Sequence, residues 1–72
     1  MDNIIKVRAK IVGEMPGWII LDKRRKLLGF CWKDAAYDKD VQWQWEGYGY
    51  KPGGGSCASL KDAVNDIVQD SY

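Results

Sequence analysis

The sequence predicts an α+β protein: a four-stranded antiparallel sheet in meander order, with one C-terminal helix packed on one face. Three observations support this fold class. Apolar and polar residues alternate over residues 3–12 and 41–50, which is the period of strands with one buried face. Two short apolar runs, residues 18–22 and 27–33, flank a charged turn and indicate a hairpin. From residue 60 onward, apolar residues recur instead at helical spacing.

The first predicted strand covers residues 3–12. Its apolar set is expected to face the core and comprises Ile5, Val7, Ala9 and Ile11. Its cationic set is expected to face solvent and comprises Lys6, Arg8 and Lys10. A row of cations on a sheet can contact phosphates, but lysines also protect an exposed edge strand from pairing with another chain.

The second and third strands are predicted over residues 18–22 and 27–33. The turn between them places four consecutive cations at the tip of a hairpin: Lys23, Arg24, Arg25 and Lys26. A hairpin tip is exposed, so these side chains either contact phosphates, contact an acidic protein surface, or are simply solvated.

The fourth strand is predicted over residues 41–50, with Val41, Trp43 and Trp45 on its buried face. Pro52 and the three glycines after it are expected to end strand pairing near Tyr50, so that KPGGGS, residues 51–56, forms a loop. The sequence GYGY at residues 47–50 resembles the centre of the aromatic motif of RNA-recognition and cold-shock domains. Aromatic residues of that motif stack on bases. The resemblance covers four residues and departs on both sides, with Glu46 at the basic first position and Lys51-Pro52 in place of the strand continuation, so no site residue is carried over from it.

The C-terminal helix is the clearest element. Ser59 is a suitable N-cap, with Asp62 three residues later. Its apolar stripe consists of Leu60, Ala63, Val64, Ile67 and Val68. So short a helix must be stabilised by packing on the sheet. The order of hairpin, further strand and helix is similar to the small DNA-binding domains of the integrase-arm type, which implies a sheet that enters the major groove.

The composition argues against catalysis. The 72 residues contain no histidine and two cysteines, which removes the commonest general base and any four-ligand zinc site. The glycines match neither the phosphate-binding loop nor the dinucleotide fingerprint. We therefore expect no catalytic residue, no cofactor and no metal. Residues 1–10 show no signal peptide, so we expect a cytoplasmic protein with reduced Cys31 and Cys57.

Charge is distributed unevenly along this single predicted domain, residues 1–72. Residues 1–33 carry eight Lys or Arg and three acids, a net charge of +5, whereas residues 34–72 carry three Lys and seven acids, a net charge of −4. Either the two halves attract each other in the fold, or the basic half meets a charged partner. The expected partner is nucleic acid or a protein that handles it, not a membrane, and a homodimer is compatible with the sequence.

These observations favour a small non-enzymatic module that binds nucleic acid. The expected contacts are Lys6, Arg8, Lys10, Lys23, Arg24, Arg25, Lys26, Tyr48 and Tyr50. The alternative is a phage-type inhibitor or adaptor, of the anti-defence or anti-CRISPR kind, that docks on a host protein or nucleoprotein. One helix covers one face of a small sheet, so four tryptophans and one phenylalanine exceed what such a core holds, unless some are exposed. The expected core comprises Ile5, Val7, Ile11, Ile20, Leu28, Phe30, Val41, Trp43, Trp45, Leu60, Val64, Ile67 and Val68.

Overall fold

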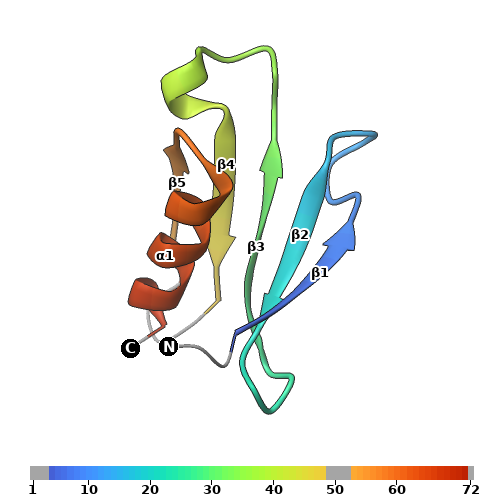
Figure 1. The fold of residues 1–72 in the computed structure, drawn as a ribbon, viewed down its shortest axis with the longest axis vertical. Coiled ribbons are helices and arrows are strands. Elements are labelled where there is room, and N and C mark those ends of the chain that lie inside the picture. Colours follow the sequence, from blue (N-terminus) through green and yellow to red (C-terminus); the bar gives the residue numbers. More distant parts are fainter. Residues whose placement is uncertain (1–3, 49–52, 72) are drawn as a thin grey trace.

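The computed structural model describes residues 4–48 and 53–71. It shows an antiparallel sheet in the order β1-β2-β3-β4-β5 with one C-terminal helix on it (Figure 1). The α+β class, the meander order and the position of the helix are therefore confirmed, but the sheet has five strands where four were predicted. The elements are β1 (Ile5–Ala9), β2 (Gly17–Leu21), β3 (Leu27–Lys33), the 3-10 helix η1 (Lys39–Val41), β4 (Trp43–Gly47), β5 (Gly53–Cys57) and α1 (Leu60–Asp70).

The fifth strand replaces most of the predicted loop. β5 (Gly53–Cys57) pairs with β4 from Gly47↔Gly53 to Trp43↔Cys57. Glycine is unfavourable in strands because it has no side chain to pack, which is why the sequence indicated a loop. Here the missing side chain leaves room for an indole, because a Cβ on Gly55 would lie 2.9 Å from Trp45 Nε1. The glycine-rich segment thus fits closely against a neighbouring indole.

The helix α1 begins as the sequence predicts. The Ser59 side-chain oxygen accepts a hydrogen bond from the Asp62 backbone N–H at 3.1 Å, which is the N-cap interaction. Ala63 and Ile67 are fully buried. The helix packs on β3 and β4 and less extensively on β5, so it covers one half of one face of the sheet (Figure 1).

Glycines let α1 approach the sheet closely. Ile20, Gly29, Gly47 and Gly53 form one row across the strands. A Cβ on Gly29 would lie 2.9 Å from Ile67 Cγ2, and a Cβ on Gly47 would lie 2.9 Å from Asp70 Oδ2. These glycines therefore lie directly beneath the helix, and side chains there would push it away.

The core was predicted in part. Ile20, Leu28 and Ile67 are buried, and Trp43, Trp45, Leu60, Val64 and Val68 pack against them partly buried. Leu28 is the extra residue of an irregularity between β2 and β3, where Ile20 pairs with Gly29 but Leu21 pairs with Leu27. Cys31, Cys57 and Ala63 complete the buried cluster and were not in the predicted core.

Two predicted core residues are exposed. Val41 lies in η1 rather than in a strand and is 37% exposed. Val7 is 41% exposed because it lies on the face of the sheet opposite α1: its partner is Ile19, whereas Lys6 pairs with the buried Ile20. The alternation of β1 was correct, but its assignment to faces was wrong, since a period of two does not say which face the helix covers.

Candidate nucleic-acid interface

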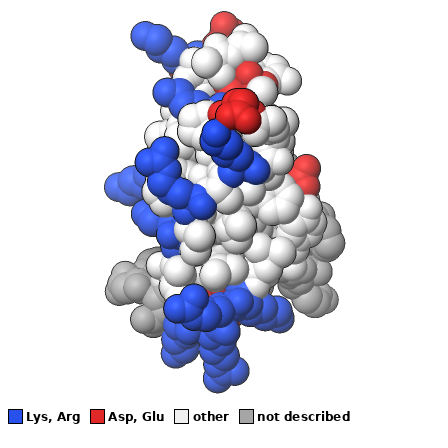
Figure 2. Space-filling model, turned by 90° about the vertical axis from the view of Figure 1, so that its right-hand side faces the viewer, with Lys and Arg blue, Asp and Glu red and all other residues white. Residues whose placement is uncertain are grey.

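The predicted contact residues of β1 lie along one edge of the sheet. We call Lys6, Arg8 and Lys10 the cationic edge; all three side chains are exposed. Figure 2, which views the molecule from the β1 side, shows Lys and Arg side chains gathered along this side and again at the lower end. Among the residues that the structure describes, the one ion pair joins Lys10 to Glu14. No ion pair of the described chain therefore links the basic half to the acidic half.

Lys6 and Arg8 point to the same face as α1. Cross-strand partners share a face, and these two residues pair with Ile20 and Trp18. The Arg8 guanidinium carbon lies 5.5 Å from the centre of the Trp18 ring, which is the geometry of a cation–π contact. Because α1 packs on β3–β5, both cations remain accessible beside the helix rather than beneath it.

The four cations of the β2–β3 connection, which we call the basic turn (Lys23, Arg24, Arg25 and Lys26), are all exposed. One side chain organises the turn: Asp22 Oδ1 accepts hydrogen bonds from the backbone N–H groups of Arg24 at 2.8 Å and Lys26 at 2.9 Å. The cations are thus presented by a fixed backbone at one end of the sheet (Figure 1).

Arg25 adopts a left-handed backbone conformation with φ of 64°, which costs a non-glycine residue roughly 1 kcal/mol. We expect Arg25→Gly to raise the free energy of unfolding by about 1 kcal/mol while removing one cation. Arg25→Ala, which removes the same cation but keeps the strained backbone, is the control and is expected to leave stability nearly unchanged. Urea denaturation measures both. A loss of stability in the glycine variant would contradict this account of the turn.

Tyr48 lies on the face of the sheet opposite α1, which we call the open face. Its ring centre lies 5.3 Å from that of Phe30, and the Phe30 ring lies 6.1 Å from that of Trp32. We call these three side chains the aromatic row. Phe30 pairs with Ile19 and Glu46, so the row belongs to the face that carries Val7 and not to the face of Lys6.

The structure therefore divides the predicted contacts between two faces. Lys6 and Arg8 of the cationic edge lie on the helix side, Tyr48 lies on the open face, and the basic turn lies at one end of the sheet (Figure 1). The Tyr48 backbone N–H donates to the Leu28 carbonyl oxygen at 2.8 Å, which places Tyr48 at the same end of the sheet as the basic turn. Tyr50 lies outside the described residues.

Two members of the aromatic row were not predicted as contacts. Phe30 was assigned to the core, and Trp32 was given no role. The excess of aromatic volume over what one helix covers was the signal that some rings are exposed, and all four tryptophans are indeed only partly buried. The sequence did not indicate which of them lie opposite the helix.

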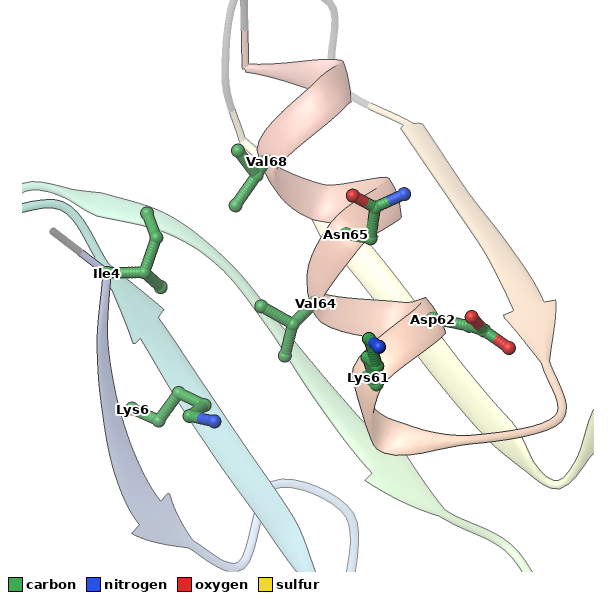
Figure 3. Close-up of a pocket in the computed structure, with 7 residues that line it drawn as sticks. All are labelled: Ile4, Lys6, Lys61, Asp62, Val64, Asn65 and Val68. Atoms are coloured by element: carbon green, nitrogen blue, oxygen red, sulfur yellow. The ribbon is translucent and has the colours of Figure 1, made fainter. Parts of the chain in front are cut away.

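A groove separates α1 from the N-terminal strand. It has a volume of about 340 Å³ and is lined by Ile4, Lys6, Lys61, Asp62, Val64, Asn65 and Val68. Figure 3 shows Val64 and Val68 of α1 facing Ile4 and Lys6 across it. The groove combines an apolar lining with two lysines at its rim, and its volume is at the small end of the range of ligand pockets.

The two cysteines are free and buried. Burial raises the pKa of Cys31 to about 11. Burial, together with a hydrogen bond from Cys57 Sγ to Asp66 Oδ2 at 2.9 Å, raises the pKa of Cys57 to about 12. Thiols held protonated are poor nucleophiles. The described residues also contain no group of three potential ligands that could hold a metal ion.

These raised pKa values predict a loss of stability in alkali. An unfolded thiol ionises near pH 8.5–9, while the folded thiols keep their protons, so the unfolded state is favoured as pH rises from about 9 toward 11–12. Urea denaturation at pH 7.5, 9 and 10 should show a falling free energy of unfolding. In the double variant Cys31→Ala, Cys57→Ala, the free energy of unfolding should fall less steeply with pH. An equally steep fall would show that the two thiols do not cause the effect.

Comparison with protein-family models, curated proteins and solved structures gives no match for this chain. No helix of the described residues is long and apolar enough to cross a membrane.

Proposed function

We propose that this protein is a non-enzymatic nucleic-acid-binding module. The observation that carries the proposal is the gathering of exposed cations, without ion-pair partners among the described residues apart from Lys10, along one edge and at one end of the sheet (Figure 2). Surface charges usually alternate in sign, and a one-signed patch attracts a polyanion through the release of its counterions.

Most acidic residues of the described chain lie away from the basic surface, but Glu14 pairs with Lys10, and Asp22 lies in the basic turn, where it accepts backbone hydrogen bonds. α1 carries Asp62, Asp66 and Asp70, and the β3–β4 connection carries Asp34 and Asp38. A protein with a net charge of +1 would bind nucleic acid weakly if its charges were mixed. Segregation lets the basic turn approach phosphates from one end of the sheet, whereas Lys6 of the cationic edge shares a groove with Asp62 of α1.

The test is a titration of fluorescently labelled 20-nucleotide single strands and 20-base-pair duplexes, followed by anisotropy at 50 and 200 mM salt. We expect binding at 50 mM salt that weakens at least 10-fold at 200 mM, because each phosphate contact adds roughly 0.7–0.9 to the slope of log K against log salt. Absence of binding to every oligonucleotide at 50 mM salt would refute the proposal.

The second candidate function is an adaptor or inhibitor that docks on a host protein. The groove beside α1 favours it, because Ile4, Val64 and Val68 offer an apolar lining under two lysines. Capture from nuclease-treated lysate tests it. One stoichiometric partner that is lost in Val64→Glu but kept in Gln69→Glu, an exposed position of the same helix, would support this function. If capture from untreated lysate instead recovers nucleic acid and no stoichiometric protein, the result would support the nucleic-acid-binding function.

A further inference from the structure

The open face carries three aromatic side chains in mutual contact, two from β3 and one just after β4. Phe30 is the centre of the aromatic row, with its ring edge-on to Tyr48 and tilted by 39° to Trp32. Tyr48 is 44% exposed, and Phe30 and Trp32 are partly exposed. Aromatic rings that line an accessible sheet surface provide stacking positions for unpaired bases.

The polar groups around the row suit bases better than phosphates. The Gln44 side-chain oxygen accepts from the Ser56 hydroxyl at 2.9 Å, and Gln44 is the cross-strand partner of Trp32. Glu46 Oε1 accepts from the Tyr48 hydroxyl at 2.8 Å. A carboxylate at this position repels phosphates, so the backbone of a bound strand is expected to run elsewhere.

The basic turn supplies the phosphate contacts at one end of the row. Tyr48 is held beside Leu28 by its backbone hydrogen bond, two positions from Lys26. The row then continues along β3 away from the turn, through Phe30 to Trp32. Cations at one end and rings along the face match the two parts of a single strand, its phosphates and its exposed bases.

Building on the proposed nucleic-acid binding, we propose that the ligand is single-stranded and that its bases stack on Tyr48, Phe30 and Trp32 while the basic turn holds its phosphates. A duplex fits this face less well, because its base faces are already stacked. Reading duplex edges requires hydrogen-bonding side chains in a groove, and the centre of the open face is aromatic and aliphatic.

A second copy of the chain fits less well for reasons of area. A stable protein interface buries approximately 800 Å² of accessible surface per partner. The chain exposes 4933 Å² in total, so such an interface would take about one sixth of it, which is more than the three side chains of the aromatic row provide. Three bases and their sugars need a much smaller contact area.

The experiment compares binding of dT12, a 12-nucleotide RNA of mixed sequence and a 12-base-pair duplex by anisotropy at 50 mM salt. We expect at least 10-fold tighter binding to a single strand than to the duplex. Trp32→Ala and Tyr48→Ala should each weaken single-strand binding about 10-fold and leave duplex binding unchanged. Tyr37→Ala, which removes a 51% exposed ring from the β3–β4 connection, is the matched control and should change neither.

A gain-of-affinity variant guards against misfolding as an explanation. Glu46→Gln keeps an oxygen that accepts from the Tyr48 hydroxyl but removes the negative charge, so single-strand affinity should rise about threefold. Duplex binding equal to or tighter than single-strand binding would overturn the inference while leaving the proposed function intact. Unchanged single-strand affinity in Trp32→Ala and Tyr48→Ala would also overturn the inference. A dimer in solution that dissociates in Trp32→Ala would overturn it as well. If no oligonucleotide binds, both the single-strand inference and the proposed nucleic-acid-binding function are refuted.

Discussion

Gly29→Ala is expected to lower the free energy of unfolding by about 3 kcal/mol, which is most of the stability of a domain this small. The added methyl group would overlap the Glu46 carbonyl oxygen and lie 2.9 Å from Ile67 Cγ2. The carbonyl belongs to the backbone of β4 and Ile67 is fully buried, so neither can move without disturbing the sheet or the helix. Urea denaturation followed by circular dichroism measures the loss.

Gly55→Ala is the matched control for this prediction. Its added methyl group would also meet an atom at 2.9 Å, but that atom is Trp45 Nε1, part of a partly buried side chain that can shift. We therefore expect a loss of about 1 kcal/mol. Equal losses in the two variants would show that glycine in a strand, rather than the close approach of helix and sheet at Gly29, determines the cost.

Replacing the whole basic turn is expected to have the largest effect on binding. The variant combines Lys23→Ser, Arg24→Ser, Arg25→Gly and Lys26→Ser. If each cation contacts one phosphate of a single strand, its loss removes roughly 0.7 from the slope of log K against log salt. The slope should therefore fall in magnitude by about 3, and affinity for dT12 at 50 mM salt should fall by at least about 100-fold.

The fold of this variant should persist, because Asp22 and the backbone groups that it binds are unchanged. Neutralising two cations at the other end of the sheet provides the comparison. Lys33→Gln with Lys39→Gln, both exposed, should weaken binding less than threefold. A loss as large as that of the turn variant would mean that general charge, not this surface, attracts the ligand.

Periodicity was enough to predict most of the fold. β3 has the predicted bounds, the helix begins after the predicted Ser59 cap, and the meander order follows from short connections. β5 could not be predicted, because Gly53–Cys57 forms a strand through backbone pairing and fit against Trp45 and not through its own side chains. Strand propensity depends on how side chains pack, so the glycine-rich segment was predicted to be a loop.

The candidate site was predictable as a list of residues but not as a surface. Exposure of the basic turn follows from its place in a hairpin, and the structure agrees. Which face each residue occupies depends on where α1 packs, and no local pattern encodes that choice. For this reason Phe30 lies on the open face and not in the core, where it was predicted to lie. Lys6 and Tyr48 lie on opposite faces because of the register of the strands.

The three glycines of β5 also have a consequence for how the strand finds its place. Gly53, Gly54 and Gly55 are identical residues without side chains. A shift in the register of β5 along β4 therefore loses no side-chain contacts made by these three residues. Ser56, through its hydroxyl bond to Gln44, and Cys57, through its burial and its bond to Asp66, are the two side chains that fix its alignment. A chain lacking both would be free to populate several offset pairings of the same two strands.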